Sequence, residues 1–136
     1  MDGIKKDTKS LPHILLVEND KASVDVTRYF LKEICAIDNA ENGEAAIKLA
    51  GQNYYPLILM DINLGCGISG MDVARQIRNI SGYKDTAIVA LTAYAAPNNK
   101  ENFLEAGMTH YLAKPFDKTS IIKLVKSVLD AAKDAR

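Results

Sequence analysis

An unbroken apolar run that ends in a carboxylate is the feature that most constrains the fold of this chain. Residues 57–60 read LILM, Asp61 follows them directly, and Pro56 and Gly65 flank the segment. A short apolar run between turn residues is typical of a strand buried on both faces of a sheet. Asp61 is then expected at the carboxyl edge of that sheet, where open α/β folds bind their ligands. Because an unpaired buried carboxylate is costly, the pattern predicts a cation or hydrogen-bond donors beside Asp61.

Similar apolar runs recur along the chain, and helical periodicity separates them. The predicted strands are residues 13–17, 35–38, 57–61, 87–91 and 111–113, and the predicted helices are residues 21–34, 44–50, from 69 onward, 97–107 and from 117 onward. Five strand–helix repeats predict a parallel sheet covered by helices on both faces. In about 125 residues this pattern favours the flavodoxin-like strand order 2-1-3-4-5. The expected fold class is therefore α/β, a (βα)5 doubly wound three-layer sandwich.

Composition argues against several other classes of protein. Of 136 residues, 48% are hydrophobic, and the 17 basic residues equal the 17 acidic ones, so nothing indicates a basic surface for nucleic acid. No apolar run approaches the roughly 20 residues of a membrane span, and the polar start does not resemble a secretory signal. Cys35 and Cys66 lack metal-ligand spacing, so we expect free thiols and a cytoplasmic location. We expect one domain over residues 12–133, a flexible N-terminal tail over 1–11 and a C-terminal tail over 134–136.

Polar side chains collect where the predicted strands end. Glu18 and Asn19 follow the first strand, Asp61 ends the third, Thr92 follows the fourth and Lys114 follows the fifth. In the order 2-1-3-4-5 these strands are neighbours, so their end residues are expected in one acidic pocket. Carboxylate and amide oxygens suit Mg²⁺, and an ammonium and a hydroxyl beside the ion suit a phosphoryl group.

Five segments in this order resemble one known family. They read LLVEN (15–19), LILMDINL (57–64), SGMDVARQIR (69–78), IVALTAYA (88–95) and HYLAKPF (110–116). Together they resemble the receiver (CheY-like) domain of two-component response regulators, and the resemblance covers residues 12–133. It implies a phosphoprotein of phosphorelay signal transduction that catalyses only its own phosphorylation and dephosphorylation, and is otherwise not an enzyme.

The resemblance also implies a role for each residue at the strand ends. Asp61 is the implied phosphoacceptor, which takes a phosphoryl group from a sensor histidine kinase or a histidine phosphotransfer protein. In the implied switch Thr92 moves toward the phosphoryl oxygens, Lys114 pairs with them and Tyr111 turns inward. The implied Mg²⁺ ligands are Glu18, Asn19, Asp61 and the backbone carbonyl of Asn63, and the implied cis peptide bond joins Lys114 and Pro115.

A downstream partner is expected to bind one surface of the domain. The family's usual signalling surface corresponds to the helix from Pro97, the strand of Tyr111 and the helix from Asp117, and its target here is an unknown protein. We expect no contact with nucleic acid or membrane. Whether the chain is free-standing or a fragment of a hybrid kinase stays open.

Apolar periodicity predicts which helix faces point inward. In the first helix the predicted inward stripe is Val26, Phe30 and Ile34. Val24 and Leu31 lie on a second face, which is either half-exposed packing or a docking patch for the phosphate donor. The second helix is expected to pack through Ala45, Ile47 and Leu49. Ser69 and Asp72, at the start of the third helix, form a capping-box pattern.

Two positions depart from the family pattern. Asn19 stands where the family usually has a second acidic metal ligand, so we expect weaker Mg²⁺ binding. The family usually has Pro four residues and Gly eight residues after the acceptor, but Gly65 and Ser69 stand there, with Gly70 nine residues on. A loop with one extra residue and a looser geometry is therefore expected.

Three alternative functions remain to be weighed. A pseudo-receiver, a phosphorylation-independent interaction module with the same fold, is favoured only by Asn19. A Mg²⁺ phosphohydrolase in the haloacid-dehalogenase manner wants a second Asp two residues after the nucleophile, where Asn63 stands. A flavodoxin wants a Ser/Thr/Gly phosphate loop after the first strand, where Glu18, Asn19 and Asp20 stand.

Overall fold

Five parallel strands form the central sheet, in the predicted order β2-β1-β3-β4-β5. The computed structural model describes residues 11–64, 67–93 and 97–134. The strands are β1 (His13–Val17), β2 (Ala36–Ala40), β3 (Leu57–Asp61), β4 (Ala87–Thr92) and β5 (His110–Ala113). All four neighbouring pairs are parallel, and β1, β3, β4 and β5 therefore send their carboxyl ends to one edge.

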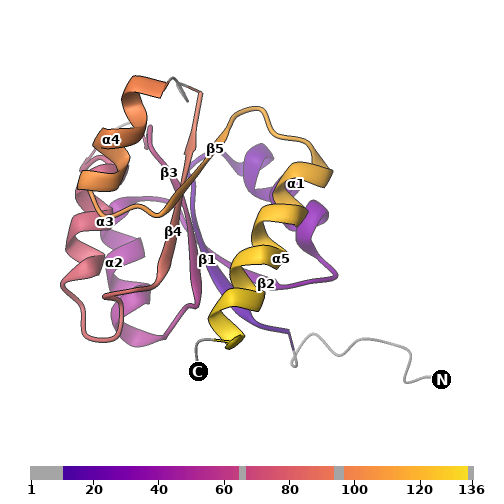
Figure 1. The fold of residues 1–136 in the computed structure, drawn as a ribbon, viewed down its shortest axis with the longest axis horizontal. Coiled ribbons are helices and arrows are strands. Elements are labelled where there is room, and N and C mark those ends of the chain that lie inside the picture. The colour runs from indigo at the N-terminus through magenta and orange to yellow at the C-terminus, as the bar shows by residue number, and fades with distance from the viewer. Residues whose placement is uncertain (1–10, 65–66, 94–96, 135–136) are drawn as a thin grey trace.

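Five helices connect and flank the strands. They are α1 (Lys21–Leu31), α2 (Gly43–Gln52), α3 (Gly70–Arg78), α4 (Pro97–Glu105) and α5 (Lys118–Asp134). Figure 1 shows α2, α3 and α4 on one face of the sheet and α1 and α5 on the other. The predicted three-layer sandwich is thus confirmed.

The sequence of the central strand β3 is continuously apolar because both faces of this strand are buried. Leu57 and Leu59 belong to the hydrophobic cluster beneath α1 and α5, whereas Ile58 and Met60 belong to the cluster beneath α2 and α3. All four side chains are fully buried, because successive strand residues point to opposite faces and both faces are covered.

The predicted inward stripe of α1 was wrong at Val26, whereas Phe30 and Ile34 are partly buried and pack against the cluster beneath α1 and α5. The helix buries Val24, Thr27 and Leu31, and the side chain of Val26 is 47% exposed. The predicted docking patch of Val24 and Leu31 is therefore core. The buried stripe was not recognised in the sequence because Thr27 carries a polar hydroxyl. In the structure this hydroxyl donates a hydrogen bond to the Ser23 carbonyl at 2.8 Å, so Thr27 is buried with its donor satisfied. The helix also ends at Leu31, before Ile34.

The packing face of α2 was predicted only in part. The three predicted residues, Ala45, Ile47 and Leu49, do pack against the core but are partly buried, and the fully buried positions are Gly43, Ala46 and Ala50. A Cβ on Gly43 would lie 2.5 Å from Val73 Cγ2. The close approach of α2 to α3 thus brings the smallest side chains of α2 inward, and size rather than hydropathy sets the face.

Side-chain caps begin four of the described helices where the sequence places polar residues. Asn42 caps α2 by accepting a hydrogen bond from the Ala45 amide at 2.8 Å. Asp20 accepts a hydrogen bond from the Ser23 amide at 3.1 Å, and Asp117 accepts one from the Ser120 amide at 2.8 Å. Ser69 accepts one from the Asp72 amide at 3.2 Å, as the capping pattern predicted.

Three sequence predictions fall wholly or partly outside the described residues. They concern the tail over 1–11, of which only Leu11 is described, Gly65 and Cys66 of the loop after β3, and the C-terminal tail, of which only Asp134 is described. Cys35 is buried and unpaired, and burial raises the pKa of its thiol to about 12. None of the described helices is both long and apolar enough to cross a membrane.

Candidate functional site

Acidic and basic side chains from distant parts of the chain meet at the carboxyl edge of the sheet. Glu18 directly follows β1, Asp61 ends β3, Thr92 ends β4 and Lys114 directly follows β5. The exposed fractions are 2% for Glu18, 5% for Asp61 and 4% for Thr92. Three polar side chains are therefore withdrawn from water at one edge, and each needs partners there.

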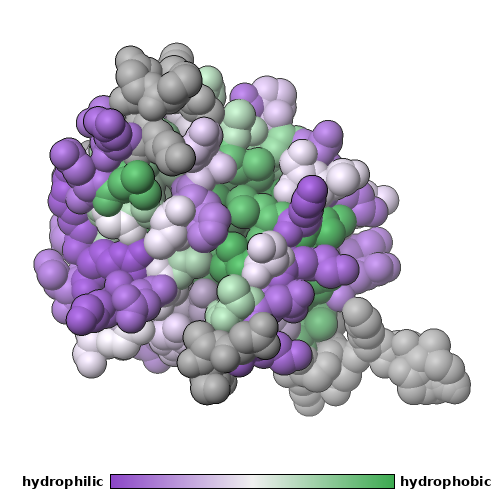
Figure 2. All heavy atoms as spheres, in the orientation of Figure 1, coloured by the Kyte–Doolittle hydropathy of each residue, from purple (hydrophilic) through white to green (hydrophobic). Residues whose placement is uncertain are grey.

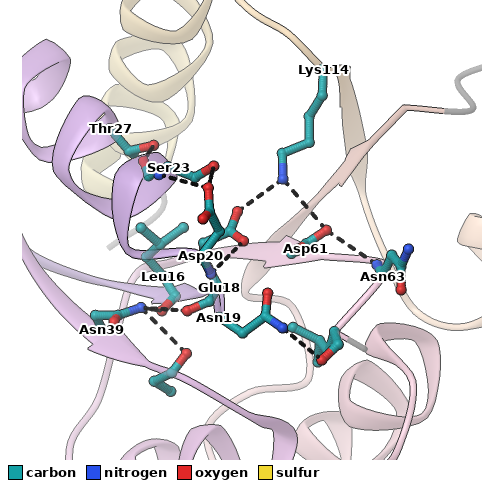
Figure 3. Close-up of polar contacts among 12 residues, drawn as sticks. Leu16, Glu18, Asn19, Asp20, Ser23, Thr27, Asn39, Asp61, Asn63 and Lys114 are labelled. Carbon is teal, nitrogen blue, oxygen red and sulfur yellow. Dashed lines mark hydrogen bonds and ion pairs between the residues drawn. The ribbon is translucent and has the colours of Figure 1, made fainter. Parts of the chain in front are cut away.

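Lys114 is the cation that was predicted beside Asp61. Its Nζ lies 2.9 Å from Glu18 Oε1 and 3.6 Å from Asp61 Oδ1. Figure 3 shows the lysine reaching down between the two carboxylates. Burial alone would lower the pKa of Lys114, but the hydrogen bond to Glu18 and the attraction of both carboxylates outweigh it and the pKa is raised. The ammonium therefore stays charged at neutral pH.

Asp61 is a carboxylate whose charged form is disfavoured. Burial, followed by repulsion from Glu18, raises its pKa to about 6, although Lys114 and the Asn63 amide act in the opposite direction. The Asn63 amide donates to Asp61 Oδ1 at 3.1 Å. Two carboxylates share one ammonium here, so the site keeps an excess of negative charge that a divalent ion would offset.

The loop after Asp61 is held at each of its first three residues. The Ile62 amide donates to the Leu91 carbonyl at 3.1 Å, and the Asn63 amide binds Asp61 itself. The Leu64 carbonyl accepts a hydrogen bond from Asn19 Nδ2 at 3.1 Å. Residues 62–64 are therefore tied to β4, to Asp61 and to the residue that follows Glu18 after β1.

Gly70, nine residues after Asp61, lies against the backbone at the end of β3. A Cβ at this position would lie 2.5 Å from the Asp61 carbonyl oxygen and 3.0 Å from Ile62 Cα. Only glycine permits α3 to begin so close to the end of β3. The sequence offered the signal, a glycine one position later than expected, but its contact is visible only in the fold.

Asn39 is a residue that sequence reasoning missed. Its Nδ2 lies 3.0 Å from the Leu16 carbonyl, 3.2 Å from the Glu18 carbonyl and 3.3 Å from the Ala40 carbonyl. It thus pins the ends of β1 and β2 together beside Glu18 (Figure 3). An asparagine inside a weak strand carries no sequence signal for this role.

The remaining predicted residues lie around this centre. Tyr111 is 39% exposed, with its ring centroid 6.4 Å from that of Phe103. The Lys114 amide donates to the Thr92 carbonyl at 2.8 Å, and the Lys114–Pro115 peptide bond is cis. The carboxylate of Asp20 caps α1 through Ser23, while the backbone amide of Asp20 donates to Glu18 Oε2 at 3.2 Å.

A hollow of about 430 Å³ opens beside the charged centre. Glu18 and Lys114 form one wall, and most of the remainder is apolar, from α1 and from the segments after β4 and β5: Ala22, Val26, Ala93, Pro115 and Phe116. An apolar surface therefore adjoins the ion pair of Lys114 and Glu18.

The donor set at this edge consists of oxygens. Glu18 and Asp61 offer carboxylates and Asn19 an amide oxygen, which is the chemistry that Mg²⁺ prefers. No group of three His, Cys, Asp or Glu side chains able to hold a metal occurs among the described residues. A divalent ion here would thus take part of its coordination from water, amide or backbone oxygens and an incoming phosphoryl group, as Mg²⁺ commonly does.

A parallel sheet with acidic groups, a hydroxyl and a lysine at its carboxyl edge is the arrangement expected of a signalling domain of the receiver class. A family model for the response regulator receiver domain matches residues 14–126. The chain belongs to this family, whose members act in two-component systems.

Curated relatives and solved structures agree with this assignment. The transcriptional regulatory protein ResD of Bacillus subtilis is 38% identical over 87% of this chain and 48% of its own, and the aerobic respiration control sensor protein ArcB of Escherichia coli is 31% identical over 98% and 17%. The receiver domain of the sensor histidine kinase PA1611 of Pseudomonas aeruginosa, solved with magnesium in its active-site cleft, is 31% identical over 89% of this chain and 99% of its own, with a TM-score of 0.81. The chain spans less than half the length of these two curated relatives.

Proposed function

We propose that this domain accepts a phosphoryl group on Asp61 with the help of Mg²⁺, and that the modification switches a protein-binding surface. The observation that carries this proposal is the position of the Lys114 ammonium, 2.9 Å from Glu18 and 3.6 Å from Asp61. A lysine placed between two buried carboxylates is positioned to neutralise a group that arrives with further negative charge.

The chemistry assigned to Asp61 is an in-line displacement. An Asp61 oxygen forms a bond to phosphorus while the bond from phosphorus to the donor's histidine nitrogen breaks, and the imidazole leaves. Bound Mg²⁺ would supply positive charge that reduces repulsion between the two anionic reactants. Glu18, Asp61, the Asn19 oxygen and the Asn63 carbonyl are the residues proposed to hold the ion. Lys114 then pairs with the phosphoryl oxygens, and Thr92 hydrogen-bonds to them.

The proposed switch leads from Thr92 to the edge strand β5. A backbone hydrogen bond joins the Thr92 carbonyl to Lys114, so a shift of Thr92 toward a phosphoryl group is transmitted to the end of β5. Tyr111 on β5 and Leu104 on α4 are exposed apolar residues of this region. Figure 2 shows hydrophobic side chains over the middle of the view, where α5 passes beside β5. We assign the output surface to α4, β5 and α5.

The phosphoryl donor is a sensor histidine kinase or a histidine phosphotransfer protein in this proposal. We assign its docking surface to the apolar hollow formed by Ala22, Val26 and Phe116, because this hollow adjoins Lys114 and Glu18. This assignment replaces the patch of Val24 and Leu31, which is buried. A cytoplasmic location fits both partners.

A labelling experiment tests the proposal. Incubation with acetyl phosphate and Mg²⁺ should add one phosphoryl group to the wild-type protein, read as an intact-mass increase, and Asp61→Asn should abolish it. Asp72→Asn is the matched control, because Asp72 is an exposed carboxylate paired with Arg75. Equal labelling of Asp61→Asn and wild type would refute the acceptor assignment. No labelling of the wild type would favour a pseudo-receiver, for which Asn19 is the motivating residue.

A further inference from the structure

We propose that Asn19 is a positioning residue that holds the loop after the phosphoacceptor, in addition to any contact it makes with a metal ion. The amide hydrogen bond from Asn19 Nδ2 to the Leu64 carbonyl spans 3.1 Å. It joins the turn after β1 to the loop after β3, which are 45 residues apart in the sequence.

The donor of this hydrogen bond is what distinguishes asparagine from aspartate. A carboxylate of the same shape has no N–H, and it would place negative charge beside a carbonyl oxygen. The tie to Leu64 is thus available to Asn19 and unavailable to the acidic residue that the sequence pattern of the family would place there.

The position of Leu64 makes this tie consequential. The Leu64 side chain is 4% exposed and packs in the cluster beneath α2 and α3, while its carbonyl faces Asn19. Asn63, the preceding residue, binds Asp61 Oδ1 through its amide. Asn63 therefore lies between two anchored points, Asp61 on one side and Leu64 on the other, and its backbone orientation is set by both.

The orientation of the Asn19 side chain follows from the same bond. With Nδ2 directed at Leu64, Oδ1 takes the opposite end of the amide, and Figure 3 shows it on the side toward Glu18 and Asp61. Asn39 holds the backbone of Glu18, the residue before Asn19, by donating to the Glu18 carbonyl. One neutral side chain thus orders the loop without adding charge to a site that already holds two carboxylates.

The consequence for the reaction rests on the proposed function, but the loop tie itself does not. Amide hydrogen exchange measured by NMR on the metal-free, unphosphorylated protein tests it directly. Removing one hydrogen bond of ordinary strength should accelerate exchange at the Asn63 amide, which donates to Asp61 Oδ1, by about threefold to tenfold. Both Asn19→Asp and Asn19→Ala should show this acceleration, since both lack the donor.

A matched control separates the lost donor from added charge. Asn42→Asp adds a carboxylate after β2 while keeping the oxygen that accepts from the Ala45 amide, and it should leave exchange at the Asn63 amide unchanged. Acceleration in Asn19→Asp but not in Asn19→Ala would assign the effect to charge and overturn the proposal, as would no acceleration in either variant. Exchange at Leu59, in the middle of β3, reports whether each variant is folded.

A calorimetric Mg²⁺ titration of the same variants extends the test to the metal. Asn19→Ala should bind Mg²⁺ more weakly than wild type, whereas Asn19→Asp gains charge and should bind it more tightly despite the looser loop. Tighter binding with unchanged exchange would leave Asn19 as a simple ligand position and overturn the loop tie. The labelling of Asp61 is measured separately, so a failed phosphoacceptor assignment and a failed loop tie give different results.

Discussion

At the residue scale, the charged centre is a balance between burial and pairing. Glu18 and Asp61 are both almost fully buried, and one ammonium lies between them. Breaking such a pairing exposes each remaining charge to the full cost of desolvation. Because two carboxylates share one ammonium, additional positive charge would stabilise the site, and this is the electrostatic basis for the proposed Mg²⁺ binding.

The raised pKa of Asp61, about 6, predicts a pH-dependent effect on stability. The folded state binds this proton more tightly than the unfolded state, in which the carboxyl has its ordinary pKa of 3.8. Folding stability therefore falls as pH rises between these values, by about 1.4 kcal/mol for each unit of difference. Asp61→Asn should stabilise the metal-free protein, and the gain should be about 2 kcal/mol larger at pH 7.5 than at pH 4.5.

Urea unfolding in EDTA at the two pH values measures this difference. Asp72→Asn serves as the reference, because Asp72 is exposed and its ion pair with Arg75 contributes little. A gain from Asp61→Asn that is equal at both pH values would show that the carboxylate is not destabilised by its surroundings.

Gly70 carries a steric prediction that is independent of charge. Gly70→Ala should lower the free energy of unfolding by about 1–3 kcal/mol, because its Cβ would lie 2.5 Å from the Asp61 carbonyl oxygen. It should also slow labelling of Asp61 by acetyl phosphate. Gly51→Ala is the matched control: nothing lies within 4 Å of its Cβ, and alanine in a helix should stabilise by up to about 1 kcal/mol. Thermal unfolding compares the two, and a tolerated Gly70→Ala would contradict the close approach.

At the scale of elements, α1 serves two purposes with two faces. Val24, Thr27 and Leu31 pack on the sheet, while Val26 borders the hollow next to Lys114. Tyr29 is also exposed, and the ammonium groups of Lys32 and Lys118 lie 4.7 Å and 5.7 Å from its ring centroid. The helix thus presents an apolar strip with basic neighbours beside the charged centre.

The two faces of α1 should respond differently to truncation. Val24→Ala removes core methyl groups and should lower the free energy of unfolding by about 1–3 kcal/mol. Val26→Ala should change it by less than about 0.5 kcal/mol, yet slow phosphoryl transfer from a histidine donor protein while leaving labelling by acetyl phosphate intact. Urea unfolding and the two labelling assays test these outcomes. Destabilisation by Val26→Ala equal to that by Val24→Ala would restore the stripe inferred from periodicity.

At the scale of the whole molecule, the site exists because of the strand order. The chain places β1 between β2 and β3, so its connections leave the sheet in opposite directions at this point, and a crevice forms at the carboxyl edge. Glu18 and Lys114, which form the shortest ion pair of the centre, are 96 residues apart in sequence. Both helical layers are needed to bury β3, and with it Asp61.

Arg78 shows how a single side chain can link several connections. Its Nε lies 2.9 Å from the Gly107 carbonyl and its Nη1 lies 2.6 Å from the Tyr83 carbonyl. The end of α3 is thus bound to the turn between α4 and β5 and to the loop before β4. Gly107 has φ +97°, a conformation that favours glycine. These contacts hold the turn that joins α4 to β5, two elements of the proposed output surface.

The sequence by itself determined the alternation of strands and helices, the sheet order and the residues at the strand ends, because each depends on local pattern and on the few topologies open to five such repeats. It did not determine which stripe of α1 is buried, the need for glycine at position 70, or the partners of Asn19 and Asn39. Those features depend on the direction from which a distant segment approaches. The distance between Lys114 and two carboxylates, and hence the raised pKa of Asp61, was decided only when the tertiary structure brought four strand ends together.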